Sequence, residues 1–208
     1  TTCLDDRGLQ DILSAACQLS ELTLSQSSTA QSVNSGLFRN SSHLFMTVKI
    51  LDIGLANMHR IMVFWPLVTA HLIEIASHPN TDLRDAGLES LTRLVVAALA
   101  HPREPPIQES PGLQQAILSP LRNLSSCNSA IAYKRQLECV LQVMDTSGDS
   151  LKHAWPVVVG IISDAMTTVD PLPNATTIRI AFDSIRMVVT DFLPKVPLPC
   201  YPLLMDTI

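Results

Sequence analysis

The sequence predicts an all-α fold, specifically a HEAT/armadillo-like α-solenoid of about eight or nine helices. Apolar residues recur at the three- and four-residue spacing of one helical face in segment after segment of the 208-residue chain. Proline-marked loops separate these segments, as they separate the helices of bundles and solenoids. A Trp-Pro marker also occurs twice, which indicates an internal repeat and favours a solenoid over a bundle.

The first helix is expected over residues 9–24, where Leu9, Ile12, Ala16 and Leu19 share one face. The Ser-rich stretch 25–42 that follows shows no periodicity, so we predict a mobile loop there. The 208 residues are enough for one sizeable core or for several stacked helical repeats. We therefore expect residues 1–208 to form a single helical-repeat domain.

Four later segments carry the same helical spacing. They are Ile61, Trp65, Val68, Leu72 and Ile75; Leu88, Leu91, Val95 and Ala98; Leu137, Val140, Leu141 and Met144; and Ile178, Phe182, Ile185, Val189 and Phe192. Because only 16% of the residues are charged and 47% are hydrophobic, each helix is expected to bury more than one stripe against its neighbours.

The markers that indicate a repeat occur in the same order twice. Trp65-Pro66 recurs as Trp155-Pro156, 90 residues later (155 − 65), and Leu83-Arg84-x-Ala86 recurs as Ile178-Arg179-x-Ala181, 95 residues later (179 − 84). This spacing predicts a five-residue loop insertion in the second copy. About 90 residues would hold two helix pairs at the roughly 40–47-residue period of HEAT and armadillo arrays.

The repeat also predicts how its helices begin. Each proline is expected in the first turn of a helix, where its missing N–H costs nothing. Asp82 and Thr177 are expected as the N-caps of the helices that follow.

Arg84 and Arg179 are expected to be structural residues of the two copies. Each falls in the first turn of a helix, where the helix dipole disfavours a cation. We expect each arginine to reach a carboxylate or a loop carbonyl to its side, with Asp82, Asp85 and Asp183 as candidate acceptors. The alternative is that both side chains simply extend into solvent.

Trp65, Trp155 and Phe182 are expected to be structural as well. Both tryptophans share a helical face with apolar residues, which favours a core position over an exposed anchor for a partner. No residue is assigned to partner binding by the sequence.

Composition limits the partners and the compartment. The net charge is −5 and the 14 Lys and Arg residues are scattered, so nucleic acid is not expected as a partner. Five cysteines without a C-x-x-C pair favour free thiols in a reducing compartment. The longest apolar run, 94–100, is far shorter than the roughly 20 residues of a membrane span, so any membrane association would be peripheral.

The sequence gives no sign of catalysis. Phosphate-binding, dinucleotide-binding, serine-hydrolase and zinc-protease motifs are absent from it. His71, Glu74 and His78 fall along one helical face and could in principle hold a metal, but Pro79 ends the helix there, and polar edges of a packed helix are the favoured interpretation. We expect no enzyme activity, no cofactor and no catalytic or metal site.

Several short strings resemble a known family in their joint order. They are 57–61 (NMHRI), Trp65, His71-Leu72, 78–80 (HPN), 137–142 (LECVLQ), 148–151 (GDSL), 155–158 (WPVV), Ala181-Phe182 and 189–194 (VTDFLP). In this order they resemble the Mon-two family of Golgi and endosome trafficking scaffolds. More distantly, they resemble the helical regions downstream of the Sec7 domain in the large Arf guanine-nucleotide exchange factors.

The resemblance implies an α-solenoid without a Sec7 domain, cytoplasmic and peripherally bound to trans-Golgi network and endosome membranes. It also implies a scaffold role in endosome-to-Golgi traffic. The implied partners are a Dopey-family protein, a phospholipid flippase and Arf-like small GTPases.

Two functions remain open at this point. The first is a non-enzymatic interaction module whose exposed ridge or groove binds another protein. The second is a regulatory region downstream of a Sec7 domain in an active Arf exchange factor. A nuclear transport receptor would share the architecture but not the order of the motifs.

Overall fold

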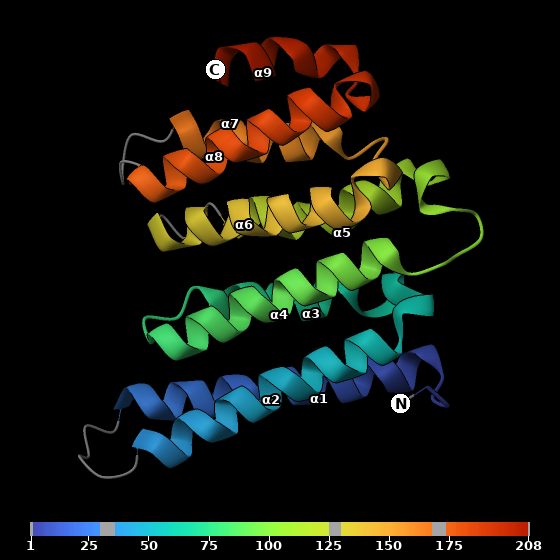
Figure 1. The fold of residues 1–208 in the computed structure, drawn as a ribbon. Helices are drawn as coiled ribbons and strands as arrows, with labels where there is room; N and C mark the ends of the chain where they lie inside the picture. Colours follow the sequence, from blue (N-terminus) through green and yellow to red (C-terminus); the bar gives the residue numbers. More distant parts are fainter. Residues whose placement is uncertain (1, 30–35, 125–129, 168–173, 208) are drawn as a thin grey trace. The chain divides into compact units, whose positions relative to one another are not determined.

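The computed structural model describes residues 2–29, 36–124, 130–167 and 174–207 (Figure 1). Every regular element within these ranges is helical. The all-α prediction is therefore confirmed, and the helices follow one another in pairs from α1–α2 to α7–α8, with α9 after them. The more specific HEAT/armadillo-like assignment is compatible with this arrangement and stays a prediction.

The chain divides into two compact units, Thr1–Ala98 and Leu99–Ile208. The single domain expected from the sequence stays a prediction. The division falls near the end of α4.

The first unit holds α1 (Asp6–Thr29), α2 (Gly36–Ala56), the 3-10 turn η1 (Met58–Arg60), α3 (Ile61–Ala76) and most of α4 (Thr81–Ala100). Helix α1 packs against both α2 and α3. Helix α2 approaches α4 where Gly54 faces the side chain of Leu94. A small cluster of buried side chains joins the helices at one end, with Leu24, Ile75 and Leu83 packed against Leu44.

The predicted loop over 25–42 is too long. Residues 25–29 continue α1 and α2 already begins at Gly36, so both ends of the predicted loop are helical; residues 30–35 lie outside the described part. Serine and asparagine lower helix propensity only moderately, so their presence does not by itself end a helix.

The second unit begins with the turn η2 (Ile107–Glu109) and continues with α5 (Pro111–Asn123), α6 (Ala130–Ser147), η4 (Gly148–Ser150), α7 (Trp155–Thr167) and α8 (Ala175–Met187). A π-helical turn, Val188–Phe192, extends α8, and two 3-10 turns lead to α9 (Tyr201–Thr207). Helix α7 is central, since it contacts α5, α6, α8 and α9.

The first helices of the two Trp-Pro pairs bury the same positions. From Ile61 to Thr69 and from Leu151 to Val159 the buried and exposed residues alternate in the same order, 90 residues apart (151 − 61). The turns η1 and η4 that precede these segments are also 90 residues apart (148 − 58). The spacing taken from the Trp-Pro marker is thus confirmed by burial.

The helices nevertheless start at different places. Trp155 is the first residue of α7 and Pro156 the second, as predicted, because proline is well tolerated there. Trp65 is the fifth residue of α3, so Pro66 lies inside the helix and the prediction for that proline is wrong. The turn Ile61–Phe64 is already helical in α3, whereas Leu151 has an extended backbone.

The predicted N-caps are wrong by two residues in α4 (82 − 80) and by three in α8 (177 − 174). The Asn80 side chain caps α4 by accepting from the amides of Asp82 at 2.9 Å and Leu83 at 3.3 Å. Asn174 caps α8 by accepting from the amide of Thr177 at 2.8 Å. An Asn side chain at the N-cap satisfies the free amides of the first turn.

These caps also correct the alignment of the second helices. Asn174 follows Asn80 by 94 residues (174 − 80), and at that offset Leu83, Ser90 and Leu91 correspond to Thr177, Ser184 and Ile185, all buried. The insertion is therefore four residues rather than five. Arg84 corresponds to Ile178, so the two arginines are not equivalent.

Two glycines allow close approaches in the two pairs. A Cβ atom on Gly87 of α4 would lie 2.7 Å from the backbone nitrogen of Ala76 in α3. A Cβ atom on Gly148 would overlap the ring of Phe192. Both contacts are closer than carbon atoms tolerate, so each pair depends on a residue without a side chain.

Candidate interaction surfaces

Both tryptophans are core residues. Trp65 is 4% exposed and Trp155 is 0% exposed. The ring of Trp155 also packs on Phe192, with ring centroids 5.4 Å apart and a tilted geometry. Their burial agrees with the expected structural role and leaves neither indole available as an anchor for a partner.

Neither arginine behaves as expected. Arg84 is half-buried, and its Nε atom has no hydrogen-bond partner among the described residues. Arg179 is exposed, and its expected acceptor Asp183 instead pairs with Arg186 at 3.1 Å. The alternative interpretation, in which the charge extends along the surface, fits Arg179 better.

Phe182 is not a core residue. It is 49% exposed on α8, and Ile178 and Val189 on the same side are exposed too. The positions equivalent to Phe182 and Val189 in α4 are Leu88 and Val95, and both are buried. The second unit therefore exposes an apolar stripe, Ile178–Phe182–Val189, and the first unit buries the counterparts of Phe182 and Val189.

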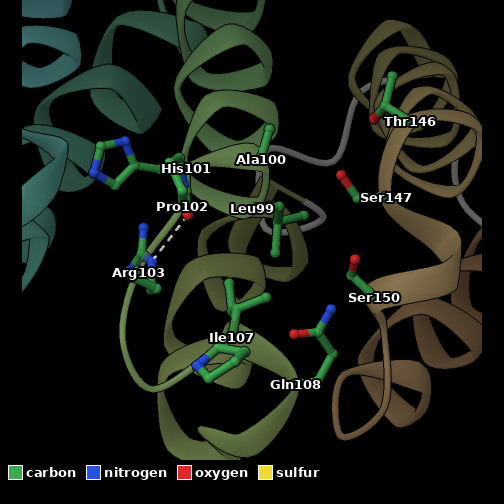
Figure 2. A pocket seen from close by; sticks show the side chains of 11 residues that line it. Leu99, Ala100, His101, Pro102, Arg103, Ile107, Gln108, Thr146, Ser147 and Ser150 are labelled. Carbon is green, nitrogen blue, oxygen red and sulfur yellow. Dashed lines mark hydrogen bonds between the residues drawn. The ribbon is translucent and has the colours of Figure 1, made fainter.

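A polar pocket lies within the second unit, between the loop that leads to α5 and the end of α6 (Figure 2). Its volume is about 430 Å³, and Leu99, Ile107 and the hydroxyl groups of Thr146, Ser147 and Ser150 line it. Arg103 lies at its edge and donates from Nε to the carbonyl of His101 at 3.4 Å. Burial lowers the pKa of the Arg103 guanidinium.

Buried Gln114 of α5 fixes the turn beside this pocket. Its Nε2 donates to the Ser150 carbonyl at 2.8 Å, and its Oε1 accepts from the amides of Lys152 at 3.2 Å and His153 at 2.9 Å. These bonds satisfy backbone groups just before α7 begins. The signal in the sequence is one glutamine on a helical face, which no spacing rule would single out.

A second polar cluster lies in the first unit, between α1 and α3. One ligand atom each from Glu21, His71 and Glu74 lies within 4.8 Å of the others. His78, which the sequence placed beside His71 and Glu74, instead accepts at Nδ1 from the amide of Asn80 in the turn before α4. Glu21 was missed because it comes from a helix that is distant in sequence.

Burial sets the protonation of this cluster. It lowers the pKa of His71, and the carboxylates of Glu21 and Glu74 oppose that shift only partly, so the imidazole is neutral near pH 7. Burial, then the same two carboxylates, raises the pKa of the Cys17 thiol to about 12. Cys17 is therefore a protonated core residue without nucleophilic character.

The other described cysteines are free thiols. Cys139 and Cys200 are buried, and burial raises the pKa of the Cys200 thiol. Cys3 is exposed, and Cys127 lies outside the described residues. Among the helices described, none is both long and apolar enough to cross a membrane.

Paired helices with a buried seam, an exposed apolar stripe and a polar pocket define the class of all-α domains built from helix pairs. A family model described as Sec7-like HDS, Mon2/Sec7/BIG1-like, matches residues 104–187, from the pocket loop to the last residue of α8.

Relatives match over nearly the whole chain. It is 38% identical to the Homo sapiens "Protein MON2 homolog" over 203 residues, 98% of this chain and 11% of that protein. The Drosophila melanogaster "Protein MON2 homolog" is 36% identical over 204 residues, and the Caenorhabditis elegans "Monensin-resistant homolog 2" is 27% identical over 206. The chain belongs to the Mon2 family and spans 11% of the length of its human relative.

Proposed function

We propose that this chain is a non-enzymatic protein–protein interaction segment of a scaffold in endosome-to-Golgi membrane traffic. The observation that carries the proposal is its similarity to Mon2 proteins over 98% of its length. The geometry supports the non-enzymatic part, because the polar side chains of Asn80 and Gln114 cap a helix and hold a turn. Binding through a side chain such as Phe182 needs no reactive group.

The finer parts of the proposal are its partners and its place in the cell. We propose a Dopey-family protein, a phospholipid flippase and Arf-like small GTPases as partners of the full-length protein. That protein would lie on the cytoplasmic side of trans-Golgi network and endosome membranes and bind them peripherally. The Ile178–Phe182–Val189 stripe is the surface we propose for the Dopey-family protein, because exposed apolar side chains are enriched where proteins meet.

A direct binding measurement tests this proposal. The 208-residue chain is titrated with a purified Dopey-family protein, and the titration is repeated with the Phe182→Ser variant. We expect the unaltered chain to bind and the variant to lose at least about tenfold in affinity. Removing a central aromatic contact usually costs more than about 1.4 kcal/mol of binding free energy, which corresponds to a tenfold change.

Phe45→Ser is the matched control. Phe45 is 57% exposed, but it lies on α2 in the other unit, so its loss should leave binding unchanged. Absence of binding by the unaltered chain would contradict the proposed partner. Equal losses in both variants would contradict the assignment of the surface to α8.

A second candidate is a regulatory region of an active Arf exchange factor. The description of the matching family model, which includes Sec7 proteins, favours it. Nucleotide exchange on an Arf GTPase by the full-length protein distinguishes the two. Exchange that depends on this segment would support regulation, and absence of exchange supports the scaffold.

A further inference from the structure

His71 is a buried polar side chain without a hydrogen-bond partner. It is 3% exposed, and neither ring nitrogen is hydrogen-bonded among the described residues. The nearest acidic atom, Oε1 of Glu21, lies 3.7 Å from Nδ1, which is too far for a hydrogen bond. Native structures rarely leave a buried imidazole unsatisfied, so this one calls for an explanation.

The fold itself does not require a histidine at this position. His71 lies six residues after Trp65, and the residue six positions after Trp155 is Ile161, which is also buried. The same place in the second helix pair is thus filled by an apolar side chain. Packing alone would favour isoleucine over histidine at both positions.

The surroundings of His71 are those of a cation site. Glu74 lies three residues further along α3, and Glu21 extends from α1. Their carboxylates face the imidazole with ligand atoms within 4.8 Å of one another. Two carboxylates at this distance repel each other, and a cation between them removes the repulsion.

We propose that Glu21, His71 and Glu74 bind a divalent transition-metal ion, with Zn²⁺ as the preferred ion. One imidazole nitrogen and two carboxylate oxygens match the ligands that Zn²⁺ accepts. Three protein ligands leave at least one position for water, and both glutamates are exposed, so the ion can reach the site from solvent. The ion would hold α1 against α3.

The lowered pKa of His71 agrees with this role, because only the neutral imidazole has a lone pair for a metal. The inference is independent of the proposed trafficking function, since it concerns how the first unit is held together. It departs from the expectation drawn from the sequence, which favoured the polar edge of a packed helix because Pro79 ends the helix after His78, and which did not consider Glu21.

The test uses Zn²⁺ alone. The 208-residue chain is treated with a chelator, dialysed and titrated with Zn²⁺ by calorimetry, and its thermal unfolding is followed with and without the ion. We expect about one ion per chain and a higher melting temperature with Zn²⁺, because a ligand that binds only the folded state stabilises it.

Three variants locate the ion. His71→Ile, chosen to match Ile161, should keep the chain folded in chelator and remove the Zn²⁺-dependent rise in melting temperature. Glu21→Gln and Glu74→Gln alter exposed side chains, so they should fold normally and weaken Zn²⁺ binding at least about tenfold. Glu89→Gln, an exposed glutamate on α4, is the matched control and should bind Zn²⁺ unchanged.

Two results would overturn the proposal. One is absence of Zn²⁺ binding by the unaltered chain. The other is binding that persists in both Glu21→Gln and Glu74→Gln, which would place the ion elsewhere. Co²⁺ provides a further check, because a sulfur charge-transfer band in its absorption spectrum would show ligation by a cysteine instead.

Discussion

Trp65-Pro66 and Trp155-Pro156 mark two helix pairs, α3–α4 and α7–α8. The first helices of the two pairs bury equivalent residues but begin at different positions relative to the tryptophan. In the first pair, helical backbone begins at Ile61, four residues before the tryptophan. In the second, Gln114 binds the amides of Lys152 and His153, and the helix begins only at Trp155. Side-chain burial thus preserves the register of a repeat even where helix ends change.

The pairs differ at one exposed position and at one buried position. At the position of buried Leu88 in α4, α8 exposes Phe182. At the position of buried Ile161 in α7, α3 carries His71 beside two carboxylates. The two helix pairs share one arrangement, but α8 exposes an apolar stripe and α3 carries a polar cluster. We expect function at these differences.

The largest effects should come from the tryptophans themselves. Trp65→Ala and Trp155→Ala should each lower the free energy of unfolding by about 3–5 kcal/mol, because each leaves a cavity in a packed core. Urea-induced unfolding followed by circular dichroism measures both. A loss below about 1 kcal/mol at either position would show that its pair is not organised around the tryptophan.

The next largest effects are expected at Gly87 and Gly148. Gly87→Ala and Gly148→Ala should each cost about 1–3 kcal/mol, because the added methyl group overlaps Ala76 in one pair and Phe192 in the other. Gly160→Ala on α7 is the control: a Cβ there meets nothing within 4 Å, so about 0.5–1 kcal/mol of stabilisation is expected. Neutral substitutions at Gly87 and Gly148 would contradict the close approaches.

The caps offer a comparison at equivalent positions. Asn80→Ala and Asn174→Ala should each cost about 1 kcal/mol, because each removes the acceptor for first-turn amides. Thermal unfolding monitored by calorimetry would measure both. If Asp82→Ala and Thr177→Ala proved the costlier substitutions, the four-residue insertion would be wrong.

Acid should distinguish the first pair from the second. The folded pKa of His71 lies below its usual value of 6.5, so the unfolded chain binds a proton more readily than the folded chain as pH falls through that value. With chelator present, the free energy of unfolding should therefore be highest above about pH 6.5. It should fall as the pH drops below that value. His71→Ile should remove this component of the pH dependence, and an unchanged profile would contradict the burial of a neutral imidazole.

The smallest effects are expected at the two arginines. Arg84→Met and Arg179→Gln should change the free energy of unfolding by no more than about 0.5 kcal/mol, because the structure gives neither side chain the lateral acceptor that the sequence suggested. Chemical denaturation can resolve a larger change. A loss of about 2 kcal/mol in either variant would indicate that the arginine does make the stabilising lateral contact expected from the sequence.

The sequence predicted the helices, the buried tryptophans and the 90-residue spacing, because all three follow from the periodic placement of apolar residues. It misplaced the helix ends. Asn80 and Asn174, rather than Asp82 and Thr177, are the caps, since any of these residue types can cap and only backbone geometry decides.

The exposure of Phe182 and the cluster around His71 were harder to predict from the sequence. Phe182 shares helical spacing with core residues, and only the neighbouring helices determine which of two apolar faces is covered. Glu21 and His71 are 50 residues apart (71 − 21), and no local spacing rule joins them. Sequence patterns define a helix face, whereas the contacts between helices define a site.

The central claim is that α3–α4 and α7–α8 are two versions of one unit, and a reciprocal exchange tests it most directly. The free energy of unfolding is measured in chelator at about pH 7 for His71→Ile and for Ile161→His. We predict that His71→Ile is at least as stable as the unaltered chain, whereas Ile161→His loses about 2 kcal/mol or more because it buries a polar ring without a partner. A strongly destabilised His71→Ile together with a tolerated Ile161→His would contradict the claim.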